Sequence, residues 1–376
     1  MPQKHEHIEW VDTVKGIAIT AVVLCHISFT GGSELRPFLG NFWHVGVFFI
    51  VAGFFVKWEK LCRPFTFIKP KVTTLYLPAT IIYSLAFLLH NTFVRCGWYP
   101  LGQSHPGNGQ PFALLEANEV LAGILKSALC IPKGELVMGA MWFLYTLIYS
   151  FIILTILAWG IEKAVARRNW TGQKKTTLML LVALCLQFGA LLFTNIYGIT
   201  IPRISTACTA VALICIGKMM FQELQCKFDN VLILLTALII AIQCIVFDGG
   251  QITLASNRYH DMLQLDMGCA SVLYIIAFLA KRFESSLIAK GFAFLGKESL
   301  YIMALHILGF FCCNTLLLHM GVYGSNSHSY YTYEINGSPL IVLAYLAFGL
   351  AVPVVIINIY RFAVKNVVKI CKNKAA

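Results

Sequence analysis

Long apolar blocks recur along most of this 376-residue chain. A helix needs about 20 mostly apolar residues to cross roughly 30 Å of hydrocarbon. Hydrophobic residues make up 58% of the chain and charged residues only 12%, whereas soluble proteins carry roughly 25% charged residues. A soluble fold of this length would lack the charge to cover its surface. The sequence therefore predicts an all-α integral membrane protein that lies in a lipid bilayer.

Ten of these blocks are predicted to be transmembrane helices. The shortest is the second, which contains Gly46 and Gly53, so we expect a broken or deeply buried helix there. The first block is extended upstream by Trp10–Val14. We find no internal repeat and no tail that suggests a separate soluble domain, which predicts one membrane domain over residues 1–376. The ten blocks are Lys15–Ser28, Phe42–Val56, Val72–Phe93, Gly139–Ile161, Thr176–Ile196, Ile204–Phe221, Val231–Phe247, Met262–Ala280, Phe292–Leu318 and Leu340–Tyr360.

Basic residues are distributed unevenly between the predicted loops. If the N-terminus is cytoplasmic, the cytoplasmic segments hold most of the 29 lysines and arginines, and the outer loops hold few. Membrane proteins concentrate lysine and arginine in their cytoplasmic loops. Both termini are therefore predicted to be cytoplasmic. Because topology also explains the net charge of +12, no nucleic-acid partner is expected.

One predicted outer loop is long and runs from Arg95 to Met138. Its stretch Ala113–Ile131 mixes apolar and charged residues and predicts an amphipathic helix at the membrane interface. Cys96 and Cys130 both fall in this loop, where they are either a disulfide or two separate thiols. The 13 cysteines of the chain match neither a disulfide framework nor a zinc site, so no metal is expected.

The first span carries three ionisable residues, Asp12, Lys15 and His26. Eleven residues make about three helical turns, so Lys15 and His26 share one helix face at a separation of roughly 16 Å along the axis. Asp12 lies one turn before Lys15 and can pair with it. Taken singly, such a lysine can simply reach the interface, and such a histidine can be a packed residue. Because ionisable groups at this depth are costly, the aligned set predicts a functional site.

The same residues resemble the first span of the acyltransferase-3 family, which consists of membrane O-acyltransferases that modify cell-surface sugars. That family has a basic residue followed by glycine, then a histidine eleven positions after the basic residue. Lys15 stands where arginine is usual, as it does in the fucose-acetylase-like branch. The residues that match are Asp12, Lys15, Gly16, Ala18 and His26.

Four later segments are similar to family patterns and follow the same order, so that the resemblance extends from Trp10 to about Leu308. They are Phe42–Phe54, similar to the second-span pattern FF-x-x-SGF with Ala52 in place of serine; Lys69, Lys71 and Pro78, similar to the basic opening of the third span; Trp142–Leu144, similar to the W-F-L opening of the fourth; and Leu295–His306, similar to a late segment that ends in histidine.

The resemblance implies transfer of an acetyl or similar acyl group to a hydroxyl of a cell-surface or envelope glycan or glycolipid. The donor co-substrate would be acetyl-CoA or another acyl-CoA, with no permanently bound cofactor. The resemblance also implies that the protein is located in a bacterial inner (plasma) membrane. A secondary transporter of a small solute is the alternative, because buried charges on many spans suit it. The lack of a two-fold repeat favours the acyltransferase.

Each candidate residue is expected to have one role. His26 is the candidate general base that removes the acceptor proton, or alternatively a transient acyl carrier, and His306 is a second catalytic candidate. Lys15, Lys69 and Lys71 are expected to bind the polyanionic head of coenzyme A. Substrate-binding candidates are Asp12, His44 and Trp142, and acceptor hydroxyls can also meet Glu135, Asp248, Asp261 and Asp266 on or near the predicted outer side.

Overall fold

The computed structural model describes residues 8–27, 42–99, 112–131, 135–198, 203–248, 252–254, 258–323, 332 and 338–375, and within these ranges it is all-helical, with no strand. All ten predicted blocks contain helices. The membrane prediction is thereby confirmed in its coarser form, whereas the count of ten spans and the side of the termini stay predictions. Seven segments are long and apolar enough to cross a membrane, namely Pro64–Arg95, Leu136–Ala164, Gly172–Tyr197, Ile204–Glu223, Tyr259–Arg282, Ser299–His319 and Pro339–Asn366.

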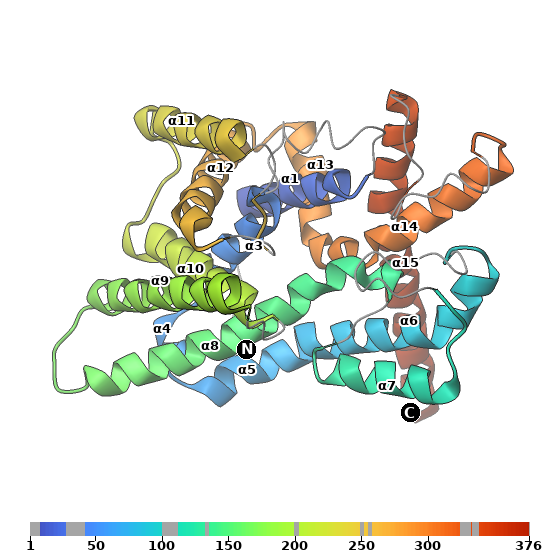
Figure 1. The fold of residues 1–376 in the computed structure, drawn as a ribbon, viewed down its shortest axis with the longest axis horizontal. Coiled ribbons are helices and arrows are strands. Elements are labelled where there is room, and N and C mark those ends of the chain that lie inside the picture. The colour runs from blue at the N-terminus through green and yellow to red at the C-terminus, as the bar shows by residue number, and fades with distance from the viewer. Residues whose placement is uncertain are drawn as a thin grey trace.

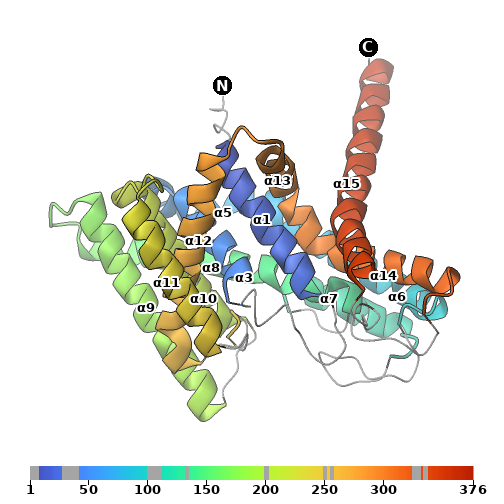
Figure 2. The same cartoon turned by 90° about the horizontal axis from the view of Figure 1, so that it is seen from above.

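The helices gather around two central ones, α1 (Glu9–Cys25) and α3 (Trp43–Phe54) (Figure 1). In Figure 2 the start of α1 and the end of α15 point to the same side of the molecule. One flank consists of α9 (Gly172–Tyr197), α10 (Ile204–Lys218), α11 (Val231–Asp248) and α12 (Met262–Arg282), and the other of α6 (Leu77–Arg95), α7 (Ala117–Ala128), α14 (Ser299–His319) and α15 (Pro339–Ala375), while α8 (Trp142–Ala164) runs between them.

Helix α3 has only 12 residues, and nearly all of them are buried, which confirms the expectation of a deeply buried short helix. The last carbonyl groups of a helix have no donor within the helix, and at a buried end other parts of the protein have to supply one. The Gln222 amide is one such donor: its Nε2 donates to the carbonyl of Phe54, the last residue of α3, at 2.8 Å and to that of Val56, just beyond the helix, at 3.0 Å. Gln222 lies in the π-helical turn η3 (Met219–Glu223) that extends α10.

The third predicted span begins earlier than its apolar block suggests. The helical path starts with α5 (Pro64–Lys71) and passes through the π-helical turn η1 (Val72–Tyr76) into α6. Pro70 lies inside α5, where proline removes a backbone donor. The hydroxyls of Thr73 and Thr74 donate to the Pro70 carbonyl at 3.0 and 2.8 Å, which satisfies that carbonyl where the helix widens.

The amphipathic helix predicted within Ala113–Ile131 is present as α7, and it packs along α6. Tyr76 near the start of α6 donates its hydroxyl to the Ala128 carbonyl at 2.6 Å. Near the other end, Asn91 exchanges two hydrogen bonds with the Leu115 backbone, at 2.8 and 2.9 Å. Helices α6 and α7 are therefore antiparallel neighbours, as Figure 1 shows.

The ninth predicted block, Phe292–Leu318, is wrong as a single helix. The chain bends at Glu298 (φ −96°, ψ 5°) and divides into α13 (Leu287–Lys297) and α14. Arg361 on α15 forms a two-pronged pair with the Glu298 carboxylate, with N–O distances of 2.6 and 3.0 Å. A bidentate guanidinium–carboxylate pair is directional and strong, so it stabilises the bend and ties α15 to it.

Helices α1 and α13 cross at a contact that only glycines permit. A Cβ built on Gly16 would overlap the Phe292 carbonyl, and a Cβ built on Gly296 would overlap the Asp12 carbonyl. The Thr13 hydroxyl lies 3.2 Å from the Ala289 carbonyl at the same crossing. Membrane helices approach closely through small residues in this way. The first family-like segment therefore packs directly on the last one.

We expect Gly16→Ala to destabilise the protein by about 1–3 kcal/mol, the usual cost of overpacking, and to lower its unfolding midpoint in detergent. Gly160→Ala is the matched control, because a Cβ at Gly160 meets no atom within 4 Å, and a Gly-to-Ala change in a helix is otherwise slightly favourable. Equal midpoints for the two variants would contradict the crossing.

Candidate active site

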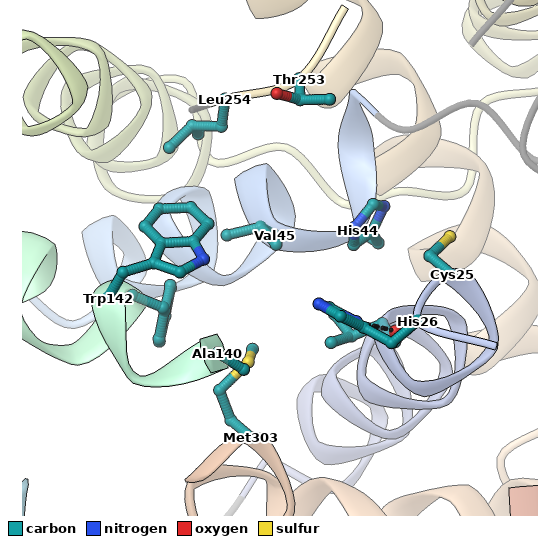
Figure 3. Close-up of a pocket in the computed structure, with 11 residues that line it drawn as sticks. Cys25, His26, His44, Val45, Ala140, Trp142, Thr253, Leu254 and Met303 are labelled. Atoms are coloured by element: carbon teal, nitrogen blue, oxygen red, sulfur yellow. Dashed lines mark hydrogen bonds between the residues drawn. The ribbon is translucent and has the colours of Figure 1, made fainter. Parts of the chain in front are cut away.

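One cavity collects several of the residues singled out in the sequence. Its volume is about 190 Å³, and its lining includes His26, His44 and Trp142 (Figure 3). Five parts of the chain contribute to its wall: α1, α3, α14, the segment 252–254, and the junction of η2 (Leu136–Met141, a 3-10 helix) with α8. The remaining lining residues are Val22, Cys25, Val45, Ala140, Phe143, Thr253, Leu254 and Met303.

His26 is the C-cap residue of α1 and is half-buried. Its Nδ1 lies 2.8 Å from the Val22 carbonyl. A carbonyl only accepts, so Nδ1 carries the hydrogen, and the lone pair of the neutral ring is on Nε2. Figure 3 shows that ring edge directed toward the space between Trp142, Ala140 and Met303. The helix end thus presents a proton acceptor to the cavity.

His306 lies directly behind His26 and not on the cavity wall. The centres of the two rings are 5.0 Å apart, and their planes are inclined by 63°. His306 is fully buried, and its Nδ1 lies 2.9 Å from the Ile302 carbonyl, so its Nε2 carries the lone pair in the same way. That Nε2 has no hydrogen-bond partner in the part of the chain that the structure describes.

His44 and Trp142 occupy the other walls of the cavity. His44 is buried on α3, where its ring meets the Trp43 ring edge-on with centres 6.1 Å apart. Trp142 is the first residue of α8 and is half-buried. Figure 3 places its indole across the cavity from His26. The structure therefore brings together three side chains that lie far apart in the sequence.

The predicted pair of Asp12 and Lys15 is present, with 2.5 Å between Lys15 Nζ and Asp12 Oδ1. The Asp12 side chain is 3% exposed and the Lys15 side chain 25%. Both belong to the first part of α1, and His26 ends the helix about three turns later. Neither residue lines the cavity. Asp12, a candidate for substrate binding, instead pairs with Lys15.

Lys69 and Lys71 also lie away from the cavity. Lys69 is exposed, and Lys71 is half-buried. The Lys71 ammonium lies 5.0 Å from the centre of the Phe151 ring and 5.6 Å from that of Phe67. Such cation–π contacts stabilise a partly buried ammonium. These two lysines are therefore not part of the cavity lining.

Two of the acidic acceptor-site candidates are buried in other contacts. Glu135 accepts hydrogen bonds from neighbouring side chains outside the cavity. Asp266 on α12 accepts from the Gln187 amide at 3.2 Å and is 2% exposed. Because a buried carboxylate needs such partners, these two residues are better explained as parts of helix contacts. Asp261 also lies outside the cavity lining, as does Asp248 at the end of α11.

Cys96 and Cys130 are separate thiols and form no disulfide. Cys96 is exposed and Cys130 is buried. Burial raises the pKa of the Cys130 thiol to about 11, so this thiol stays protonated at neutral pH and is a poor nucleophile.

Several of the wall residues were not predicted from the sequence. Thr253 and Leu254 come from the connection between α11 and α12, and Met303 lies one turn before His306. Met303 could have been found from its spacing to His306, since i and i+3 share a helix face. No local pattern marks Thr253 or Ala140, because only the tertiary fold brings them to the cavity.

A family model described as an acyltransferase domain matches residues 8–358. The matched range contains every helix from α1 onward and most of α15. No curated protein and no solved structure matches the chain.

Replacing Lys15 tests the pair with Asp12. We expect Lys15→Met to lower the stability by about 3 kcal/mol, because it removes the ammonium that faces a buried carboxylate. The double variant Asp12→Asn/Lys15→Met removes both charges and should recover most of the loss. Unfolding midpoints in lipid or detergent measure both effects, and a double variant less stable than Lys15→Met would contradict this assignment.

Proposed function

Since this chain belongs to the acyltransferase-3 family, we propose that it transfers an acetyl or similar acyl group from an acyl-CoA to a hydroxyl of an envelope glycan or glycolipid. The observation that carries the proposal is the cavity in which His26, with its anchored tautomer, faces Trp142 and His44. The membrane character of the helices and the family support a membrane acyltransferase. The donor, the acceptor and an inner-membrane address belong to the proposal.

His26 is the general base in this proposal. Its Nε2 takes the proton of the acceptor hydroxyl while the hydroxyl oxygen attacks the thioester carbonyl. The tetrahedral intermediate then collapses, the carbon–sulfur bond breaks, and the coenzyme A sulfur receives the proton from the imidazolium. The products are an ester and a free coenzyme A thiol. The hydrogen bond from Nδ1 to the Val22 carbonyl keeps the reactive nitrogen oriented throughout.

His306 supports the same step as a neighbouring group. Its ring centre lies 5.0 Å from that of His26, close enough for a charge on one ring to act on the other. Two imidazolium ions at this separation would repel, so the pair is expected to carry at most one extra proton. Because burial disfavours a charged imidazole and His306 is fully buried, His306 is proposed to stay neutral while His26 gains the proton of the acceptor hydroxyl.

The size of the cavity fits the reacting ends of two substrates. Pockets that enclose a drug-sized ligand measure roughly 300–1,000 Å³, and this cavity has about 190 Å³. It is large enough for an acyl thioester and the hydroxyl-bearing edge of a sugar. The Trp142 indole offers a flat face to a sugar ring, and His44 can bind a neighbouring hydroxyl. The rest of each substrate would lie outside.

The cationic residues are proposed to bind the head of coenzyme A. Lys15 lies about three turns from His26 along α1, and the pantetheine arm is long enough to connect two such sites. Its ammonium is partly exposed and already faces Asp12. Lys69 and Lys71 would add positive charge for the phosphates. This assignment predicts that charge at these lysines affects donor binding and not the chemical step.

Replacing His26 by Ala should lower kcat by about 10²–10⁴-fold, the usual contribution of a general base, with little change in acyl-CoA binding. The assay follows coenzyme A release and ester formation by purified protein in lipid, with acetyl-CoA and candidate glycans. The matched control is His319→Ala, because His319 makes the same hydrogen bond to a carbonyl one turn earlier, at 2.7 Å, but is exposed.

Two outcomes decide the proposal. If wild-type protein neither binds nor consumes any acyl-CoA in the presence of these glycans, the acyltransferase assignment to this cavity is wrong. If His26→Ala and His319→Ala both retain full turnover, the reaction occurs but His26 is not its base.

A single-turnover experiment without acceptor separates the two roles of His26. A general base releases no coenzyme A until an acceptor is present. An acyl carrier would instead release about one equivalent at once, because an acyl-imidazole forms first. We expect no such burst, and a burst that disappears in His26→Ala would assign the acyl-carrier role.

A further inference from the structure

Three buried side chains outside the cavity form one hydrogen-bonded network. His90 on α6 places its Nδ1 2.8 Å from Glu135 Oε1 and its Nε2 3.0 Å from the Ala113 carbonyl. The Tyr99 hydroxyl donates to Glu135 Oε2 at 2.9 Å. The exposed fractions are 4% for His90, 2% for Glu135 and 0% for Tyr99. All three side chains of this network are therefore buried.

The network holds the segment that becomes the wall of the cavity. The Val137 N–H donates to the Tyr99 hydroxyl at 3.1 Å. Glu135 and Val137 begin the 3-10 helix η2, which leads through Ala140 to Trp142, and both of these line the cavity. A displacement at Glu135 would therefore move the wall opposite His26.

The same network is fixed to the rest of the fold. The Tyr99 ring stacks on Phe112, with centres 5.1 Å apart, and meets Phe311 of α14 edge-on at 6.1 Å. Next to it, the Trp98 indole donates to the Thr315 hydroxyl of α14 at 3.0 Å. Helix α14 also carries His306. The Tyr99 side chain thus links the η2 wall to the helix behind His26.

Counting hydrogens shows that the network needs one shared proton. Both nitrogens of His90 face acceptors, a carboxylate oxygen and a carbonyl oxygen, whereas a neutral imidazole has one N–H. The geometry is satisfied by an imidazolium with a carboxylate, or by a neutral ring with a protonated Glu135. If the proton leaves, the Nδ1 lone pair faces a carboxylate oxygen and the contact becomes repulsive.

We propose that His90, Glu135 and Tyr99 are positioning residues that hold the Trp142 wall of the cavity in place through one shared proton. The proposal rests on the proposed function, because its effect on turnover requires an acyl-transfer reaction in the cavity. None of the three residues is among those that line the cavity. They act through η2 on the side where the acceptor is proposed to bind.

The pH dependence follows from the shared proton. Burial raises the pKa of Glu135, while the hydrogen bonds from His90 and Tyr99 oppose that rise. Burial also raises the pKa of Tyr99, so its hydroxyl stays a donor. The other ionisable groups facing the network are Glu119, near His90, and Tyr83, near Tyr99. The network is complete at low pH, and it is lost as pH rises through the titration of the pair.

Two substitutions at Glu135 test the proposal. In Glu135→Gln the amide donates to the Nδ1 of a neutral His90 and accepts from Tyr99, so the network is complete without the shared proton. We expect the turnover of this variant to be close to that of wild type at low pH. At high pH it should not fall, whereas wild-type turnover should fall as the network is lost. In Glu135→Ala the network is lost, and we expect KM for the acceptor to rise by about tenfold, as for a displaced contact, with KM for acyl-CoA within twofold.

Deuterium exchange supplies a readout that does not depend on activity. The backbone amides of 136–141, including the Val137 N–H, should be protected in wild type at low pH and lose protection as pH rises, after correction for intrinsic exchange. Glu135→Gln should keep the protection at every pH, and Glu135→Ala should lack it throughout. The matched control is Glu162→Gln at the other end of α8, where Glu162 pairs with Lys175 at 2.9 Å.

The outcomes separate this proposal from the proposed function. The positioning role is overturned if Glu135→Gln loses protection and turnover as Glu135→Ala does, or if wild-type protection does not depend on pH. Absence of turnover in wild type, with the expected exchange pattern, would instead overturn the acyltransferase chemistry and leave the network supported.

Discussion

The close crossing of α1 and α13 is the contact on which the rest of the site depends. Gly16 and Gly296 let the two backbones touch, and the bend at Glu298 then sends α14 back along the outside of α1. This geometry places His306 behind His26. A Cβ at either glycine would overlap a carbonyl oxygen of the other helix, so a larger residue would force the helices apart and change the distance between the two imidazole rings. The packing of these two glycines thereby affects the distance between two ionisable rings, on which their electrostatic interaction depends.

A second constraint comes from the cost of unpaired polar groups in an apolar surrounding. The structure meets it at helix ends and bends. Gln222 binds the last carbonyls of α3, and Lys218 in turn donates to Gln222 Oε1 at 2.7 Å and lies 3.3 Å from Glu223. At the bend before α14, Arg361 pairs with the Glu298 carboxylate. These contacts permit short and broken helices that hydrophobicity alone would not produce, and the cavity is built from their ends.

Much of this architecture could be predicted from the sequence, because apolar blocks directly reflect helices in lipid. Every predicted block contains a helix, and the pairing of Asp12 with Lys15 followed from their spacing. The division at Glu298 was missed although the polar residues Lys297, Glu298 and Ser299 interrupt the ninth apolar block there. The partner Arg361 that stabilises the bend is distant in sequence and could not be predicted. Lys218 is one of the 29 lysines and arginines used to predict the topology, yet it is 2% exposed. A charge count does not distinguish a buried cation from a solvated one.

The candidate site shows the same division between local and tertiary information. His26, His44 and Trp142 were found because each stands in a segment with a family-like pattern, and the cavity brings them together. Glu135 was noted only as one of several acidic residues near the predicted outer side. Its partners His90 and Tyr99 lie 45 and 36 residues away, and only the folded chain shows that their hydrogen bonds require a proton. A reactive residue can be recognised in the sequence as an ionisable residue within an apolar span. A residue that positions the wall of a cavity can be recognised only from its contacts in the folded chain.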